Sequence, residues 1–125
     1  MQEKKQIIII SIVTLVVILG VVLIGINKNS SLDTSGKYDV FAKCVASKGL
    51  TMYGAVWCPH CQNEKSHFGS SFKYVPYVEC PDNIKLCDEK GVVGFPTWID
   101  SAGKKYEGEQ GLAGIAKISG CELPQ

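Results

Sequence analysis

The chain has 125 residues, a formal net charge of +1 and six cysteines, and it contains no arginine. A chain of this length has room for one small domain. Arginine is the residue best suited to bidentate contacts with phosphates and base edges, and no basic stripe replaces it here. We therefore expect no nucleic acid partner.

Residues 7–26 form an apolar segment that is interrupted only by two glycines, Ser11 and Thr14 and carries no charge. Twenty residues at about 1.5 Å of helical rise match a hydrocarbon core of about 30 Å. A cleaved signal peptide has a shorter apolar region and a small-x-small cleavage site. The sequence therefore predicts one N-terminal transmembrane helix that serves as an uncleaved signal-anchor.

The flanking charges and the cysteines predict how this anchor is oriented. Lys4 and Lys5 precede it, which by the positive-inside rule favours a cytoplasmic N-terminus over residues 1–6. All six cysteines follow it, and such a content is typical of an oxidising compartment. We expect a single-pass protein of the cell membrane, with a polar flexible linker over 27–37 and a folded domain over 38–125 on the extracytoplasmic side.

Within 38–125, helical and strand patterns alternate. Helices are expected from Asp39, which can cap the first one, to Gly49, and then over 59–68, from 82 or 83 to 87, and over 112–119. Strands are expected over 51–57, 74–79, 96–100 and 105–109, the last two as a hairpin. The alternation predicts an α/β sheet with an antiparallel hairpin at its end.

The run Trp57-Cys58-Pro59-His60-Cys61 lies where a predicted strand passes into a helix. Two residues between the cysteines leave the first sulfur exposed and the second within disulfide reach. The first sulfur faces free N–H groups and the positive end of the helix dipole, which stabilise a thiolate. His60 adds a cation or a donor. Cys58 is predicted to be the attacking and leaving thiol, and Cys61 the resolving one.

A zinc site is the main alternative, with Cys80 and Cys87 completing the ligand set. Those two cysteines have six residues between them, whereas zinc pairs usually have two to four. A purely structural disulfide between Cys58 and Cys61 would close too short a loop to contribute much. We therefore expect a redox pair, with no metal and no bound cofactor.

The WCPHC run and the later Gly94-Phe95-Pro96-Thr97 together resemble the thioredoxin superfamily. More narrowly, the sequence is similar to the thioredoxin-like domain found fused to, or encoded beside, bacterial and plant vitamin K epoxide reductase homologues. The segments that carry this narrower resemblance are 52–55, 57–61, 68–69, 77–80, 94–98, 106–108 and 119–121. The resemblance covers nearly all of 38–125 and implies a thioredoxin-like fold, a central mixed sheet flanked by helices.

The resemblance also implies a cis peptide bond before Pro96, in a loop that lies beside the cysteines and binds substrate backbone. Phe95, Thr97 and Trp57 are then expected to bind the substrate. Tyr53 either joins that apolar surface or belongs to the core.

One departure from thioredoxin concerns the proton on Cys61. Thioredoxin carries a buried acid six residues before its first active cysteine, and Met52 occupies that position here. Glu64 or a water molecule are the remaining proton acceptors. The missing acid argues against a general reductant of the thioredoxin kind.

The Pro-His pair between the cysteines is that of the strongly oxidising periplasmic enzyme of the DsbA type, whereas thioredoxin has Gly-Pro. We therefore predict a membrane-anchored extracytoplasmic thiol–disulfide oxidoreductase that donates disulfides to exported cysteine-containing proteins. The resemblance implies that a quinone-linked membrane partner similar to vitamin K epoxide reductase reoxidises it. Two alternatives stay open, a thioredoxin-like reductase or isomerase of exported proteins and a non-catalytic metal-binding chaperone module.

The remaining four cysteines, Cys44, Cys80, Cys87 and Cys121, allow three pairings, among which the sequence does not choose. A local bridge between Cys80 and Cys87 is plausible and would leave Cys44 to Cys121. Structural bridges are favoured, and a second redox pair that relays electrons from Cys58 is the alternative. His67 is predicted to lie on the surface.

Overall fold

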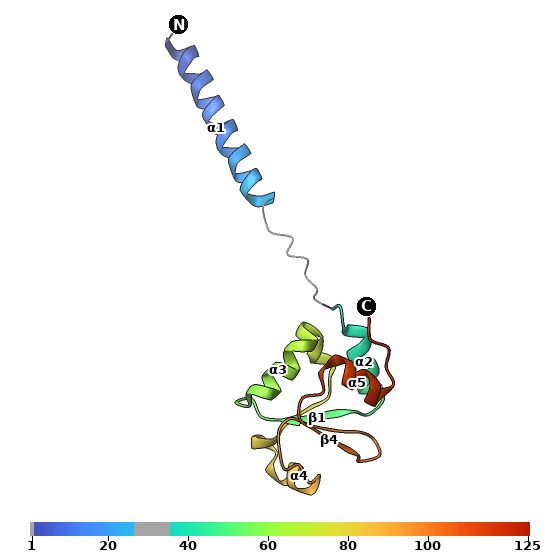
Figure 1. Ribbon diagram of the computed structural model, residues 1–125. Coiled ribbons are helices and arrows are strands. Elements are labelled where there is room, and N and C mark those ends of the chain that lie inside the picture. Colours follow the sequence, from blue (N-terminus) through green and yellow to red (C-terminus); the bar gives the residue numbers. More distant parts are fainter. Residues whose placement is uncertain (1, 27–35) are drawn as a thin grey trace. The chain divides into compact units, whose positions relative to one another are not determined.

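The computed structural model describes residues 2–26 and 36–125, and the chain divides into two compact units, 1–33 and 34–125 (Figure 1). In the first unit the structure describes helix α1, Gln2–Ile26, whose apolar side chains are exposed between Ile7 and Leu19. In the described parts of the chain, no helix is both long enough and apolar enough to cross a membrane. The prediction of a helix over 7–26 is confirmed, but that of a membrane span is not. The predicted linker lies outside the described residues except for 36 and 37.

The second unit is built on a four-stranded mixed sheet in the order β2-β1-β3-β4. The central strand β1 pairs in parallel with β2 and antiparallel with β3, and β3 pairs antiparallel with β4. The strands are β1 Thr51–Gly54, β2 Tyr77–Glu79, β3 Thr97–Ile99 and β4 Lys105–Glu107. The predicted α/β sheet with a closing hairpin is confirmed, and the arrangement is compatible with a thioredoxin-like fold.

Helices cover both faces of this sheet (Figure 1). One face carries α2 Asp39–Ser47, α3 Pro59–Phe68 with the following 3₁₀ helix η1 Gly69–Tyr74, and α5 Gly111–Ser119. The other face carries the 3₁₀ turn η2 Cys80–Asp82 and the short helix α4 Ile84–Glu89. Helix α3, which begins directly after Cys58, therefore packs in the layer that buries most of the apolar side chains.

The alternation of side chains along β1 and β3 explains the two layers. Successive residues of a strand point to opposite faces of the sheet. Met52 and Trp98, which are paired across β1 and β3, belong to the large cluster under α2, α3 and α5. Tyr53 and Ile99 belong to the smaller cluster with Cys80 and Cys87. Tyr53 is therefore a core residue, which was one of its two predicted places.

One predicted strand start and one predicted helix cap differ from the structure for local reasons. The strand expected over 74–79 begins only at Tyr77, because Pro76 has no N–H to donate to the sheet and Val75 donates to Phe72 of η1 instead. Asp39 opens α2 but does not cap it. Its carboxylate accepts the hydroxyl of Ser71 at 2.7 Å, so it ties α2 to η1.

Two disulfides complete the domain. Cys44 of α2 is bonded to Cys121 beyond α5, across 77 residues of sequence, and Cys80 of η2 is bonded to Cys87 of α4. The zinc alternative fails because Cys80 and Cys87 hold each other.

Candidate functional site

The redox motif begins where the chain leaves β1 and enters α3. Pro59 occupies the first turn of α3, where a missing N–H costs nothing, and Cys58 is the N-cap residue. The Cys58 sulfur accepts the backbone N–H of Cys61 at 3.2 Å. A sulfur atom thus takes the place of the side-chain oxygen that usually satisfies the first free N–H groups of a helix.

Cys58 and Cys61 are the free thiols of the described chain, and both are buried, at 5% and 0% exposure. The expectation of an exposed first sulfur is wrong. The loop before Pro96 lies against it, and the Phe95 carbonyl oxygen is 3.8 Å from the Cys58 sulfur. Only an edge of Cys58 is therefore open to an incoming thiol.

Burial raises the pKa of the Cys61 thiol to about 12, and the hydrogen bond with Cys58 acts in the same direction. Cys61 consequently keeps its proton at neutral pH, and it must exchange that proton with a neighbour each time its bond to another sulfur forms or breaks. A buried thiol that keeps its proton fits the role of the resolving cysteine behind an attacking Cys58.

The loop facing the two cysteines contains a cis peptide bond between Phe95 and Pro96, as the resemblance implied. Pro96 is buried, whereas Trp57 is 68% exposed and meets the half-buried Phe95 edge to face, with ring centroids 6.0 Å apart. Thr97 is 1% exposed and its hydroxyl donates to the Gly94 carbonyl at 2.8 Å. Its side chain cannot contact a substrate in this arrangement, which corrects its predicted binding role, whereas Trp57 and Phe95 are suitably placed.

His60 is exposed and lies with Nδ1 2.5 Å from a carboxylate oxygen of Glu109, which precedes α5. The other oxygen of Glu109 accepts the side-chain amide of Asn63 at 2.5 Å. The Asn63 donor and then His60 hold the pKa of Glu109 below its ordinary value. Sequence reasoning missed this carboxylate because 49 residues separate it from His60.

Glu64 is fully buried in α3, and its two oxygens accept three N–H groups. The donors are the Trp98 indole at 2.8 Å and the backbone of Gln110 and Gly111 at 3.0 Å each. An ionised carboxylate, which only accepts, matches these partners. Glu64 joins α3 to β3 and to the start of α5, and this structural role displaces it as the candidate proton acceptor for Cys61.

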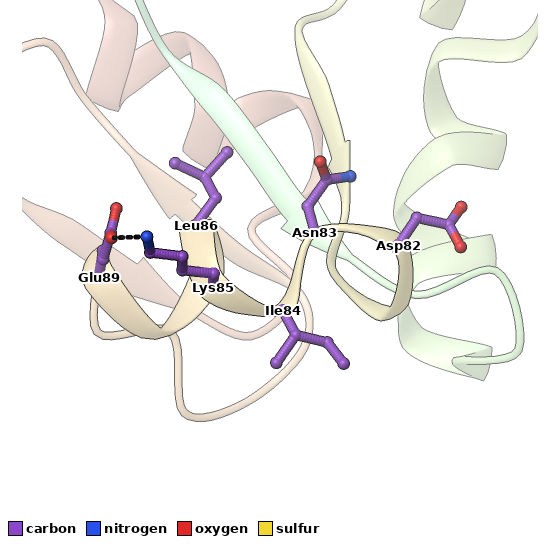
Figure 2. A pocket seen from close by; sticks show the side chains of 6 residues that line it. All are labelled: Asp82, Asn83, Ile84, Lys85, Leu86 and Glu89. Atoms are coloured by element: carbon purple, nitrogen blue, oxygen red, sulfur yellow. Dashed lines mark ion pairs between the residues drawn. The ribbon is translucent and has the colours of Figure 1, made fainter.

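Two other features were candidates for a site. Glu64, Glu109 and the exposed His67 place potential metal-ligand atoms within 4.8 Å of one another, but the bonds just described already engage both carboxylates. A separate pocket lies along η2 and α4, where Lys85 and Glu89 form an ion pair at 3.9 Å (Figure 2). Its lining contains no thiol and no histidine. The chemistry of this domain is therefore best assigned to the cysteines at the start of α3.

The site is of the thioredoxin-like, thiol–disulfide class. It combines a C-x-x-C motif that caps a helix with a cis-proline loop against the first sulfur, on a mixed sheet. No protein-family model matches the chain. It is 42% identical over 103 residues to Thiol-disulfide oxidoreductase LTO1 of Arabidopsis thaliana. The matched region covers 74% of this chain and 27% of that protein. It is 31% identical over 86 residues to Protein disulfide isomerase-like 2-2 of Oryza sativa subsp. japonica, covering 58% and 23%.

These relatives are a thiol–disulfide oxidoreductase and a protein disulfide isomerase-like protein, which supports a place in the thioredoxin superfamily and dithiol–disulfide exchange as the chemistry. The chain spans about a quarter of the length of each. They do not confirm the narrower resemblance to the domain associated with vitamin K epoxide reductase.

Proposed function

We propose that this chain is a protein-disulfide oxidoreductase that donates the Cys58–Cys61 disulfide to exported cysteine-containing proteins, here called clients. The observation that carries the proposal is the position of the Cys58 sulfur as N-cap acceptor of the Cys61 N–H at 3.2 Å, beside a buried partner thiol. A helix N-terminus stabilises a thiolate, and a stabilised thiolate is both a good attacking and a good leaving group.

The exchange has two steps. A client thiolate attacks the Cys58 sulfur of the Cys58–Cys61 disulfide, a mixed disulfide forms, and Cys61 leaves with the electron pair and takes up a proton. A second client thiolate then attacks the client sulfur of the mixed disulfide, and Cys58 leaves as a thiolate. The client has lost two electrons, and both cysteines of the chain are reduced.

The surface around Cys58 suits an unfolded client. Val56 and Trp57 on the motif side are 63% and 68% exposed, and Val93 in the opposite loop is 85% exposed. These side chains offer apolar contacts, and the loop at Phe95 and Pro96 brings the Phe95 backbone carbonyl close to the reacting sulfur. Recognition of backbone and apolar side chains is tolerant of sequence, as a general disulfide donor requires.

The proposed direction of electron flow, from the client to this chain, is supported by the Pro59-His60 pair and by the apolar Met52 in place of a buried acid. We expect the reduction potential of the Cys58–Cys61 pair, measured by equilibration with glutathione buffers, to be about −120 mV rather than about −270 mV. These two values differ by about 7 kcal/mol for two electrons. The control is the double variant Pro59→Gly with His60→Pro, which carries the thioredoxin dipeptide and should be more reducing. A wild-type value near thioredoxin's would contradict the assignment as a donor.

A second candidate, isomerase activity, is supported by the printed names of the rice relatives, which are protein disulfide isomerase-like proteins. Thiol trapping of the protein in cells separates the two functions. A donor should be recovered mainly with Cys58 and Cys61 oxidised, and an isomerase or reductase mainly with both reduced.

The proposed location, a single-pass protein of the cell membrane with its domain on the extracytoplasmic side, rests on the sequence of residues 7–26 and on the cysteine content. Fractionation tests it directly. The full chain should stay with membranes after an alkaline carbonate wash, and a variant that begins at residue 34 should be soluble. Release of the full chain by the wash would overturn the proposal.

The proposed reoxidant, a quinone-linked membrane protein similar to vitamin K epoxide reductase, rests on the sequence resemblance. Confinement to one membrane would raise the effective concentration of the two proteins. Reduced protein should regain its disulfide in liposomes that hold such a partner and a quinone. An equal rate in liposomes with the quinone alone would exclude this partner.

A further inference from the structure

The buried Cys61 thiol must exchange a proton each time its bond to another sulfur forms or breaks. The position of the usual buried acid is occupied by Met52, which is fully buried and apolar, and the carboxylate of Glu64 is bound to three N–H groups. A thiol with a pKa of about 12 does not release or regain a proton quickly without a neighbouring acid or base. With both of these positions excluded, the proton must pass through water or through another polar group beside the Cys61 sulfur.

The neighbour that the fold provides is Tyr77 of β2, brought close to Cys61 by the absence of a side chain at Gly54. A Cβ placed on Gly54 would lie 2.8 Å from the Cys61 sulfur, 3.3 Å from a ring carbon of Tyr77 and 3.4 Å from its phenolic oxygen. The Cys61 sulfur and the Tyr77 phenol therefore both border the space that a side chain at position 54 would occupy. Their separation cannot exceed the sum of the first and last of these distances, which makes the phenol a direct neighbour of the sulfur.

Tyr77 continues into a second proton carrier. Its hydroxyl donates to one carboxylate oxygen of Glu79 at 2.5 Å, and the other oxygen accepts the backbone N–H of Val56 at 2.8 Å. Glu79 is half-buried and Val56 is exposed, so this carboxylate connects the interior at Cys61 with water at the rim of the site.

The charges around this group keep the phenol protonated. Burial, followed by the hydrogen bond and the charge of Glu79, raises the pKa of Tyr77 well above its ordinary value, and the charges of Cys61 and Cys58 act in the same direction. Lys65 of α3 lies with its ammonium 3.5 Å from the centroid of the Tyr77 ring, and its charge favours the thiolate of Cys61. The Tyr77 phenol therefore keeps a proton that it can donate to the Cys61 sulfur.

We propose that Tyr77 and Glu79 form a proton relay between Cys61 and water, an inference that rests on the proposed exchange at Cys58–Cys61. When the Cys58–Cys61 bond breaks, the departing Cys61 thiolate takes the phenolic proton, directly or through one water, and a proton from solvent replaces it by way of Glu79. In the reverse direction the Cys61 proton leaves along the same path as the thiolate attacks a mixed disulfide. The relay carries protons only, and the electron pair stays with sulfur.

The test is a single-turnover reaction of the oxidised protein with a reduced two-cysteine peptide, quenched with acid and quantified by mass spectrometry. Tyr77→Phe removes the phenolic proton and keeps the ring that packs on Lys65. It should slow disulfide transfer about 10²-fold at pH 7, the lower end of the contribution of general acid–base catalysis. The deficit should grow between pH 6 and pH 8.5, because hydronium ions that substitute for the phenol become scarcer.

Glu79→Gln keeps an oxygen that can accept the Val56 N–H but cannot carry a proton, and it should slow the same step. Tyr106→Phe is the matched control. It also removes a hydroxyl bonded to a carboxylate, that of Asp100 at 3.2 Å, but in β4 at the opposite edge of the sheet. Its rate should equal that of the wild type.

A structural defect is separated from a relay defect by the reactivity of Cys58 alone. In a Cys61→Ala background, the rate at which iodoacetamide alkylates Cys58 should be the same with and without Tyr77→Phe. If the wild type transfers disulfides and Tyr77→Phe and Glu79→Gln do so equally fast, the relay is excluded and the exchange function stands. If the wild type itself transfers none, the proposed function is wrong.

Discussion

Two short cysteine pairs lie in or beside helices of this domain, and they differ in state. Cys58 and Cys61 at the start of α3 are free thiols, whereas Cys80 and Cys87, at η2 and α4, form a disulfide. Burial does not distinguish them, because all four cysteines are at most 5% exposed. The difference lies in their surroundings, since the Cys58 sulfur accepts an N–H at the first turn of a ten-residue helix and has a cis-proline loop against it.

The helix start at Cys58, and not burial, therefore distinguishes the Cys58–Cys61 pair from the Cys80–Cys87 bridge. A helix terminus that supplies N–H groups stabilises the thiolate and so favours the reduced form. The Cys80 sulfur accepts no comparable N–H among the described contacts. The Cys80–Cys87 bridge instead anchors α4 against the small core with Tyr53 and Ile99.

The largest expected effect tests which pair reacts. Cys58→Ala should abolish disulfide transfer to a reduced peptide, because no other free thiol of the described chain occupies a helix N-cap. The double variant of Cys80 and Cys87 to Ala should keep most of the wild-type rate. If that double variant lost transfer while remaining folded by circular dichroism, the second pair would have to be part of the electron path.

The two structural bridges should differ in their contribution to stability. Cys44–Cys121 spans 77 residues and Cys80–Cys87 spans seven. The chain-entropy estimate for these loops is about 4.5 and about 2.5 kcal/mol. In urea unfolding, replacing Cys44 and Cys121 by Ala should therefore cost about 2 kcal/mol more than replacing Cys80 and Cys87. Equal losses would show that the short bridge is supported by contacts other than loop closure.

The smallest expected effect is a pH dependence that belongs to the reduced redox pair. The pKa of Cys61 is raised in the folded state from 9.0 to about 12, so its contribution to stability is complete below about pH 9 and is lost as the pH rises toward 12. Reduced wild type should lose about 1 kcal/mol between pH 8 and pH 10 relative to reduced Cys61→Ala. Parallel pH profiles of the two proteins would contradict the burial of a protonated Cys61.

Several features of the site could be predicted because they are local. The span of α3 from Pro59 to Phe68 follows from a proline at the first turn and from Gly69, which takes a positive φ just after the last residue. The cysteine spacing then places one sulfur at the N-cap and the other one turn away, inside the layer. Relations among residues three or four apart are set by helix geometry alone.

Other features depended on contacts between distant segments. The choice of Cys121 as the partner of Cys44, the Glu109 carboxylate at His60 and the three N–H groups at Glu64 all join segments more than 30 residues apart. No local periodicity records such pairings.

The proton exchange of Cys61 shows most clearly the difference between local features and those set by tertiary contacts. The reactive motif, the helix that begins at Cys58 and the apolar Met52 in place of a buried acid could all be predicted from neighbouring residues. The group that replaces that acid could not, because it depends on the parallel pairing of β1 with β2, which sets Met52 against Tyr77 and Gly54 against Glu79. That register, together with the missing side chain at Gly54, brings the Tyr77 phenol beside the Cys61 sulfur of α3, with the Glu79 carboxylate bonded to the phenol.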